Sequence, residues 1–495
     1  MSKKPRLIWL ILAAFGLILQ FFTFGNGQDI EAKIKIDSRT PSIAQITGRF
    51  LKTERPNKRN LTFLGELAGI PNIAGRIKLV KCRGVDGEIL PVKQFNAAEY
   101  LTSAADIAQF SYEVSLAPPT SASSRVHISW TDAESGLLML DDLLPQGGSN
   151  IAAKLSFDLP EGWSLNSTEP VLSPNVYSVA NVEKAVFAFG KGWRQREIQT
   201  SGTPLGISIS GEWRFTDADV GEMSSSILES YAKTFGGVPS LRQQIIMFHM
   251  PPDVPFDRWE AETRGSTVVI TSSDMPFDTQ SKQRLHEQLR HEMFHLWIPN
   301  GVNLGGNYDW FYEGFALYQS LRMGVATNRI RFDDFLDTLS RAITTDRLHS
   351  NGMSLIDASK NRFSGSNSTV YARGMVVAFL CDLALLDKSK GKRSVEDLLR
   401  DVYQKYHDSA VRADGNEAVL NILAERPELG PIIERYIKKG EVVASDEYFN
   451  YAGIEAVTQN SVTTLKVLPK PNSRQKDLLD KLGYNTWRKL RIISK

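Results

Sequence analysis

Residues 291–295 read His-Glu-Met-Phe-His, and they lie in the stretch 278–297, where apolar side chains recur at the spacing of a helix. Positions i and i+4 of a helix share one face, so the imidazoles of His291 and His295 can bind the same ion. Glu292 follows one step round the helix, where it can reach a water molecule bound to that ion. The sequence therefore predicts a metal-binding helix that carries its own general base.

The spacing of these two histidines is unusual for this composition, because the chain has only 7 histidines in 495 residues. The alternative is that both are ordinary surface histidines of an amphipathic helix. A third ligand decides between these interpretations, because a catalytic zinc ion takes three protein ligands and leaves one position open to water.

Residues 310–318 read Trp-Phe-Tyr-Glu-Gly-Phe-Ala-Leu-Tyr and supply a candidate for that ligand. Glu313 lies 18 positions beyond His295, and the Gly- and Asn-rich stretch 301–307 can turn the chain back between them. A carboxylate among aromatic side chains is costly to bury unless a cation pairs with it. We therefore predict that His291, His295 and Glu313 bind one Zn²⁺ ion.

The segments His-Glu-x-x-His-x-Trp and Trp-Phe-x-Glu-Gly-Phe-Ala-x-Tyr resemble those of the gluzincin metallopeptidases, and most closely the glycyl aminopeptidase family. The resemblance implies a β domain followed by a mostly helical, thermolysin-like catalytic domain. It also implies Zn²⁺ as the cofactor, hydrolysis of peptide bonds, and peptides or proteins as substrates.

The stretch 371–385 begins Tyr-Ala-Arg-Gly and is similar to a family segment in which a tyrosine stabilises the oxyanion of the tetrahedral intermediate. The resemblance assigns that role to Tyr371. A phenol hydroxyl near the metal would stabilise negative charge on the carbonyl oxygen of the substrate. The alternative is a tyrosine at the start of a helix with no catalytic part.

The sequence departs from gluzincin aminopeptidases at the strand that holds the free amino group of the substrate. Those enzymes carry a Gly-x-x-Glu motif there, whereas this chain has no glutamate in the expected place. Glu260 or Glu262 would replace it only if the loop folded back. We expect residues 267–271 to form an edge strand that pairs with an extended peptide. The expected substrate contacts are Gly265, Ser266 and Thr267. Cleavage from the end or from within a peptide stays open.

The periodicity of apolar residues divides the chain, whose 42% apolar and 23% charged residues are ordinary for a globular protein. Short alternating runs over 29–212 predict an all-β, sandwich-like domain, and 213–440 reads as the mostly helical catalytic domain, giving a multidomain α+β fold. Residues 441–495 form a tail too short for the complete PDZ domain found near the C-terminus of many family members. The expected helices are 223–235, 278–297, 309–323, 332–345, 369–387, 394–407 and 430–438.

Residues 1–28 have the layout of a secretory signal peptide or a membrane anchor. Three cations at positions 3, 4 and 6 precede an uncharged, mostly apolar run from Leu7 to Phe24. This run is near the short end of what spans a bilayer, and cleavage before Gln28 is equally compatible with it. If uncleaved, the segment attaches the protein to a membrane. Positive residues stay inside, so the rest of the chain is predicted to lie outside the cytoplasm, in the periplasm, secreted or anchored.

Charge and cysteine content narrow the possible classes of protein. The 58 basic and 56 acidic side chains give a net charge of +2, which offers no reason to expect nucleic acid as a partner. The two cysteines, Cys82 and Cys381, are too few for a disulfide scaffold or a cysteine-rich zinc module. Whether they pair stays open, although the apolar run around Cys381 favours a buried thiol.

Two other functions fit the same residues. One is a catalytically silent, zinc-stabilised module that binds peptides or proteins of the cell envelope; loss of Glu292 would be its clearest mark, and Glu292 is present. The other is a hydrolase that acts on different amide or epoxide substrates. The peptide substrate and the oligomeric state stay open.

Overall fold

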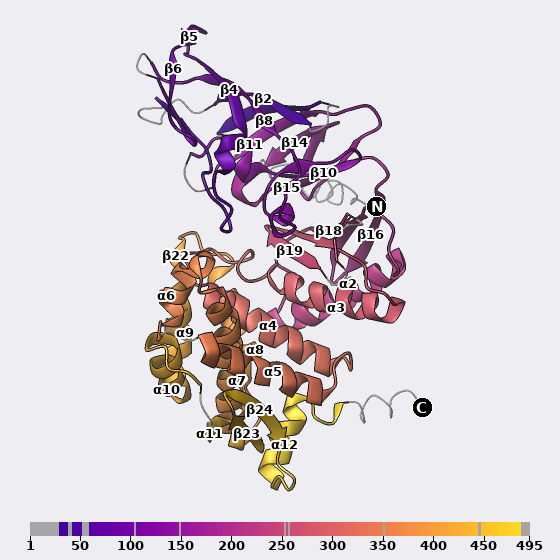
Figure 1. Cartoon of the computed structure of the whole chain (residues 1–495), viewed down its shortest axis with the longest axis vertical. Coiled ribbons are helices and arrows are strands. Elements are labelled where there is room, and N and C mark those ends of the chain that lie inside the picture. The colour runs from indigo at the N-terminus through magenta and orange to yellow at the C-terminus, as the bar shows by residue number, and fades with distance from the viewer. Residues whose placement is uncertain are drawn as a thin grey trace, which may run out of the picture.

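The computed structural model describes residues 29–37, 42–51, 59–102, 105–147, 150–251, 254–255, 258–349, 352–443 and 447–486. A β domain, a mixed sheet and a helical body follow one another along the long axis of the molecule (Figure 1). This arrangement confirms the predicted fold class. The expected signal peptide or anchor at 1–28 lies outside the described residues.

The β domain is a sandwich of two main sheets with a small third sheet beside them. Alternate residues of β1 (Ile30–Ile36) are buried, as expected for a strand with one face on the core. The other strands of the eight-stranded sheet are β2 (Ile43–Phe50), β4 (Ile77–Arg83), β5 (Ile89–Leu90), β8 (Gln109–Ser115), β11 (Ala153–Asp158), β13 (Val171–Ser173) and β14 (Val176–Val179). The four-stranded sheet contains β9 (Trp130–Thr131), β10 (Ser135–Met139), β12 (Ser164–Asn166) and β15 (Val186–Gly190). The small sheet contains β3 (Asn60–Thr62), β6 (Val92–Asn96) and β7 (Glu99–Thr102).

A five-stranded mixed sheet joins the two halves of the chain. Its order is β16-β17-β18-β20-β19, and β17 pairs in parallel with β18 across the expected domain boundary at residues 212 and 213. Amino-acid composition alone could not show that β17 and β18 share a sheet, because the sequence of a strand does not identify the strands with which it pairs. The strands are β16 (Arg194–Thr200), β17 (Thr203–Ile209), β18 (Gln243–His249), β19 (Trp259–Arg264) and β20 (Thr267–Ser272).

The edge strand on the side of β20 is β19, so the stretch 267–271 is not the edge that the sequence suggested. Residues 259–264 pair antiparallel with β20 and leave β20 between two neighbours. The prediction was wrong because the segment Trp-Glu-Ala-Glu-Thr-Arg lacks the apolar run of a buried strand. Charged side chains are characteristic of edge strands, which face solvent or a cavity.

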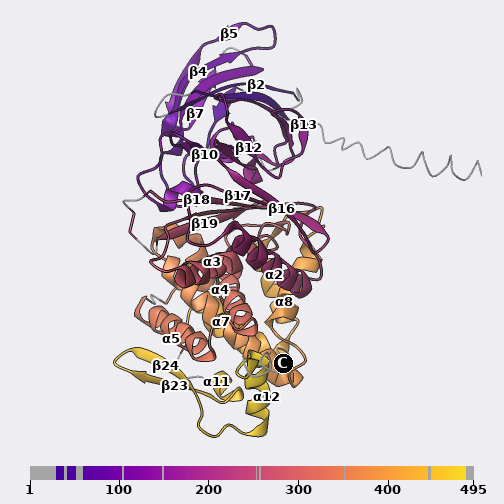
Figure 2. The ribbon, with the colours of Figure 1, turned by 90° about the vertical axis from the view of Figure 1, so that its right-hand side faces the viewer.

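The two faces of the mixed sheet are covered by different partners. A buried apolar cluster joins Ile246, Phe248 and Val269 of this sheet to the four-stranded sheet of the β domain. Helices α2 (Asp217–Phe235) and α3 (Asp278–Phe294) lie on the side of the helical body (Figure 2). The β domain and the helical body are therefore fixed to one another through the mixed sheet.

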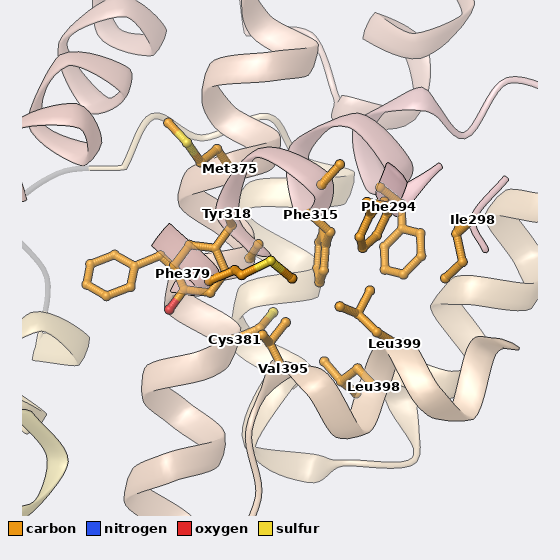
Figure 3. Close-up of a cluster of buried hydrophobic side chains, with 14 of the residues drawn as sticks. Phe294, Ile298, Phe315, Tyr318, Met375, Phe379, Cys381, Val395, Leu398 and Leu399 are labelled. Carbon is orange, nitrogen blue, oxygen red and sulfur yellow. The ribbon is translucent and has the colours of Figure 1, made fainter. Parts of the chain in front are cut away.

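The helical body is built around the crossing of α4 (Asp309–Ala326) and α7 (Asn367–Ser389). A Cβ atom added to Gly314 would lie 2.3 Å from the carbonyl carbon of Gly374, so the two backbones touch. The core beside this crossing contains Phe315, Phe379 and Leu398 (Figure 3). The other helices are α5 (Phe332–His349), α6 (Leu355–Lys360), α8 (Val395–Tyr406), α9 (Gly415–Ala424), α10 (Gly430–Ile432) and the π-helical turn η7 (Ile433–Lys438).

Helix α7 is long and apolar enough to cross a membrane by length and composition alone, but 94% of its most apolar window is buried inside the protein. Its burial is that of a core helix. Cys381 lies in this helix and Cys82 in β4, and both thiols are free and buried.

The tail after residue 440 packs on the helical body. It contains α11 (Glu447–Tyr451), the hairpin of β23 (Ile454–Gln459) and β24 (Val462–Val467), and α12 (Ser473–Leu482). The backbone N–H of Leu465 donates to Ser340 Oγ at 2.8 Å and so attaches the hairpin to α5.

Candidate active site

His291, His295 and Glu313 converge at the junction of α3 and α4. The Nε2 atoms of the two histidines are 3.3 Å apart, and Glu313 Oε2 lies 3.4 Å from Nε2 of His291 and 3.5 Å from that of His295. A tetrahedral zinc ion with bonds of about 2.0–2.1 Å holds its ligand atoms about 3.3–3.4 Å apart. The three predicted ligands therefore already have the spacing that such an ion requires.

The outer atoms of the ligands are held in place. His295 Nδ1 lies 3.0 Å from the carbonyl oxygen of Ile298, a bond that leaves Nε2 as the free donor atom. Glu313 Oε1 forms an ion pair with Arg362 Nη1 at 3.0 Å, while Oε2 has no hydrogen-bond partner in the part of the chain that the structure describes. Two nitrogens and one carboxylate oxygen form a donor set that suits zinc.

The electrostatics of the cluster favour a bound cation. Burial would raise the pKa of Glu313, but His295, His291 and Arg362 outweigh it and hold this pKa well below its usual value. Burial would lower the pKa of His295, but Glu313 and Glu292 raise it to about 9. Without a metal the cluster retains a proton, and metal binding would displace that proton.

Glu292 lies beside the cluster, where the sequence placed the general base. Thr263 Oγ1 of β19 lies 2.9 Å from Glu292 Oε2. Burial raises the pKa of Glu292 above its usual value, which brings the carboxylate closer to the range in which a base works at neutral pH.

Tyr371, to which the family resemblance assigned the oxyanion role, lines both cavities from α7. Its hydroxyl lies 2.5 Å from Nη2 of Arg362, whose guanidinium carbon stacks 5.1 Å from the centre of the phenol ring. Arg362 also pairs with Asp309 at 2.9 Å. Sequence reasoning missed Arg362, because a single arginine in the short 3-10 helix η5 (Arg362–Ser364) forms no recognisable pattern.

Two cavities meet at Glu292. The smaller, of about 480 Å³, contains the metal cluster and is lined partly by the β domain, through Ala68, Ile70 and His127. The larger, of about 700 Å³, extends between α3, α4 and α5. The cavities share the lining residues Glu260, Ala261, His291, Glu292 and Tyr371.

Strand β19 places Glu262 at the smaller cavity without any folding back of the loop. Its carboxylate lies 3.2 Å from His127 Nδ1 of the β domain. Burial would raise the pKa of Glu262, but His127 and Arg264 outweigh it and keep the carboxylate ionised. In the sequence, Glu260 and Glu262 both precede Gly265, and nothing there shows which of them reaches the cavity.

The structure does not bring the expected substrate contacts Gly265, Ser266 and Thr267 to the cluster. Gly265 and Ser266 form the turn between β19 and β20, and Thr267 opens β20. The Gly265 N–H donates to Asn300 Oδ1 at 2.8 Å. None of the three lines either cavity, because the strand next to the cluster is the one before this turn.

Neither the protein-family models nor the curated proteins contain a match to this sequence, but solved structures do resemble it. An aminopeptidase N family protein from Idiomarina loihiensis superimposes with a TM-score of 0.73 at 16% identity, covering 90% of this chain and 82% of that one. A mutant M1 zinc metallopeptidase from Deinococcus radiodurans, bound to a Tyr-Ser-Ala substrate, gives 0.56 at 14% identity over 84% of this chain and 95% of that one. A two-domain M1 zinc metallopeptidase mutant bound to L-arginine gives 0.53 at 12% identity, over 84% and 94% of the two chains. The narrower resemblance to glycyl aminopeptidases stays a prediction. The chain has the fold of the M1 zinc metallopeptidases.

Proposed function

We propose that this protein is a zinc-dependent aminopeptidase that removes residues from the N-terminus of short peptides. The observation that carries the proposal is the presence, in one cavity, of a tetrahedral donor set and of a separate ionised carboxylate, Glu262, on an edge strand. The metal ligands support peptide hydrolysis, and Glu262 supports recognition of a free amino group.

His291, His295 and Glu313 would hold the zinc ion. When bound there, zinc would lower the pKa of a water molecule and polarise the carbonyl group of the substrate. Glu292 accepts the proton of the attacking water and delivers it to the leaving amine.

Tyr371 donates a hydrogen bond to the carbonyl oxygen as negative charge develops on it. Burial and the nearby Glu313 keep the pKa of Tyr371 well above its usual value despite Arg362, so the phenol retains its proton at neutral pH. Arg362 holds Tyr371 and Glu313 together through one guanidinium, which fixes the phenol relative to the ligands.

The edge of β19 supplies the surface for the peptide. An extended substrate can pair with the open side of this strand, and main-chain hydrogen bonds then fix the position of the substrate in the cavity. The ammonium group of the peptide pairs with Glu262, which lines the same cavity as the metal ligands. The peptide and the amino acid bound to the two M1 metallopeptidases are consistent with such substrates.

The deciding experiment compares the wild type with Glu292→Gln and Glu262→Gln on peptides with free and N-acetylated amino ends. We expect one zinc per chain in all three proteins. Only the wild type should release the first residue rapidly, and acetylation should abolish release.

Three other outcomes of this experiment would each favour a different function. Cleavage at internal bonds of acetylated peptides would make the protein an endopeptidase. Bound zinc with no cleavage of any peptide would favour the silent binding module, and cleavage of non-peptide amides or epoxides alone would favour the other hydrolase.

We also propose that the protein acts outside the cytoplasm, on the basis of the cations and apolar run at 1–28. N-terminal sequencing of the mature protein distinguishes a cleaved signal from an anchor. Activity of a reporter that works only outside the cytoplasm, fused after residue 495, tests export itself.

A further inference from the structure

Arg290 directly precedes the first metal ligand and is a buried cation that forms no ion pair with any carboxylate of the described residues. The residue is 3% exposed and lines the larger cavity. Its Nε lies 3.3 Å from Ser320 Oγ, and its Nη1 lies 2.7 Å from His286 Nδ1. Exposed Glu287 lines the same cavity and acts on Arg290 only from beyond ion-pair distance. Within the described residues, no hydrogen bond of Arg290 Nη2 is found beside those of Nε and Nη1.

The groups that hold Arg290 orient it without neutralising it. Burial, Arg290 and Arg329 lower the pKa of His286 to about 3, so this imidazole is a neutral acceptor at physiological pH. A buried guanidinium that lacks an anion retains a large desolvation penalty. An anion that enters the cavity would relieve that penalty and gain a charge-assisted hydrogen bond.

The other cations of the larger cavity differ from Arg290. Lys282 pairs with Asp219 at 3.2 Å and Asp278 at 3.3 Å, and Arg341 pairs with Asp337 at 2.5 Å. Arg329 is exposed at the cavity rim. Arg290 is therefore the cation of this lining that is both buried and free to bind a ligand.

The position of Arg290 relative to β19 indicates which end of a peptide it meets. The final residues of β19, including Glu262, line the smaller cavity, whereas its first residues, from Trp259, line the larger one. A peptide paired along this strand would lie with one end in each cavity. If Glu262 holds the amino end, the leaving part of the peptide extends toward Arg290.

We infer that Arg290 binds a carboxylate on the leaving side of the substrate and makes the enzyme selective for short peptides that carry one there. This inference rests on the proposed function. The carboxylate is either the C-terminal group of a short peptide or an Asp or Glu side chain. Arginine suits both, because its planar guanidinium offers parallel N–H donors to a carboxylate.

The test measures binding to the inactive Glu292→Gln protein by calorimetry, so it does not depend on turnover. Three tripeptide ligands share one sequence: the free acid, its C-terminal amide, and the amide with Asp in the last position. We expect the acid to bind about tenfold or more tightly than the plain amide, because a hydrogen bond between charged groups is lost in the amide. If a side-chain carboxylate is the natural partner, the Asp-containing amide should bind as tightly as the acid.

The same measurements on Arg290→Gln, Arg290→Lys and Arg341→Gln in the Glu292→Gln background assign the effect. The preference for carboxylate should vanish in Arg290→Gln, return in part in Arg290→Lys, and persist in Arg341→Gln, which removes a cation already paired with Asp337. Zinc content and thermal unfolding verify that each variant is folded. Equal affinities of acid and amide for the parent protein would overturn the inference, as would an unchanged preference in a folded Arg290→Gln protein. A retained preference without any hydrolysis by the wild type would refute the proposed function and leave the carboxylate site standing.

Discussion

The hydroxyl oxygen of Thr263 lies 2.9 Å from both the carbonyl oxygen and Oε2 of Glu292. One side chain thus joins the edge strand β19 to the proposed general base. A substrate that pairs with β19 would be placed relative to Glu292 partly through this contact, so Thr263 should matter for catalysis without touching the metal.

Replacing Thr263 with valine should lower kcat about tenfold, because the substitution removes a hydrogen bond to a charged group while preserving side-chain shape. KM should change little, since the backbone edge of β19 is retained. Steady-state kinetics on a peptide substrate measure both constants. Thr263→Ser keeps the hydroxyl and should restore most of the activity; equal losses in serine and valine variants would contradict a role for the hydroxyl.

Removing the third ligand should separate this site from a chance pair of histidines. Glu313→Ala is expected to weaken zinc binding by more than about 100-fold, which exceeds typical losses for residues behind the ligands. Competition with a chelator gives the affinity. Glu260→Ala removes an acid from the same cavity but outside the cluster, and should leave zinc affinity unchanged. Zinc should also raise the unfolding temperature of the wild type and not of Glu313→Ala.

The backbone contact between Gly314 and Gly374 should make a single methyl group disruptive. Gly314→Ala is expected to destabilise the protein by about 1–3 kcal/mol, because the added carbon would overlap the α7 backbone. It should also weaken zinc binding, since Glu313 is the preceding residue. Chemical denaturation reports the first effect. Gly221→Ala in α2 is the matched control: its added carbon meets only Ile207 at 4.0 Å, so a small gain in stability is expected.

His286 should make the protein less stable in mild acid. Its pKa is lowered from 6.5 to about 3 in the folded state, so the unfolded chain takes up a proton first as the pH falls below 6.5. The free energy of unfolding should then fall by about 1.4 kcal/mol per pH unit from this residue alone.

Denaturation of the wild type and His286→Gln between pH 7.5 and 5 isolates this contribution. The glutamine can accept the hydrogen bond of Arg290 but does not titrate. Between these two pH values the wild type should lose about 2 kcal/mol more than the variant. Parallel losses in the two proteins would show that other groups set the acid stability.

The metal cluster was predictable because its signal is local. Two histidines on one helix face and a glutamate in an aromatic segment on the next helix need only helical geometry and a turn between them. The long helices of the second half were also found from apolar spacing, with ends displaced by a few residues, because burial of one face dominates their sequences. The shorter helices α6, α9, α11 and α12 were missed, because ten residues or fewer give a weak periodic signal.

The remaining parts of the site depend on contacts between segments far apart in the chain. Glu262 lies at the cavity because β19 pairs with β20, and the polar sequence of β19 does not predict this pairing. Arg362 and Arg290 are single charged residues, and only the folded structure shows that one bridges Glu313 and Tyr371 and that the other is buried beside His286. The same limit applies to the domain boundary, which the parallel pairing of β17 with β18 crosses.

The walls of the smaller cavity come from both halves of the chain. Ala68, Ile70 and His127 belong to the β domain, while the metal ligands belong to the helical body. A helical fragment expressed alone would retain every ligand but would lose the part of the cavity wall that the β domain supplies. Sequence changes in the β domain would thus alter which peptides enter the cavity without altering the metal ligands. During evolution, the range of substrates can therefore change while the catalytic residues stay the same.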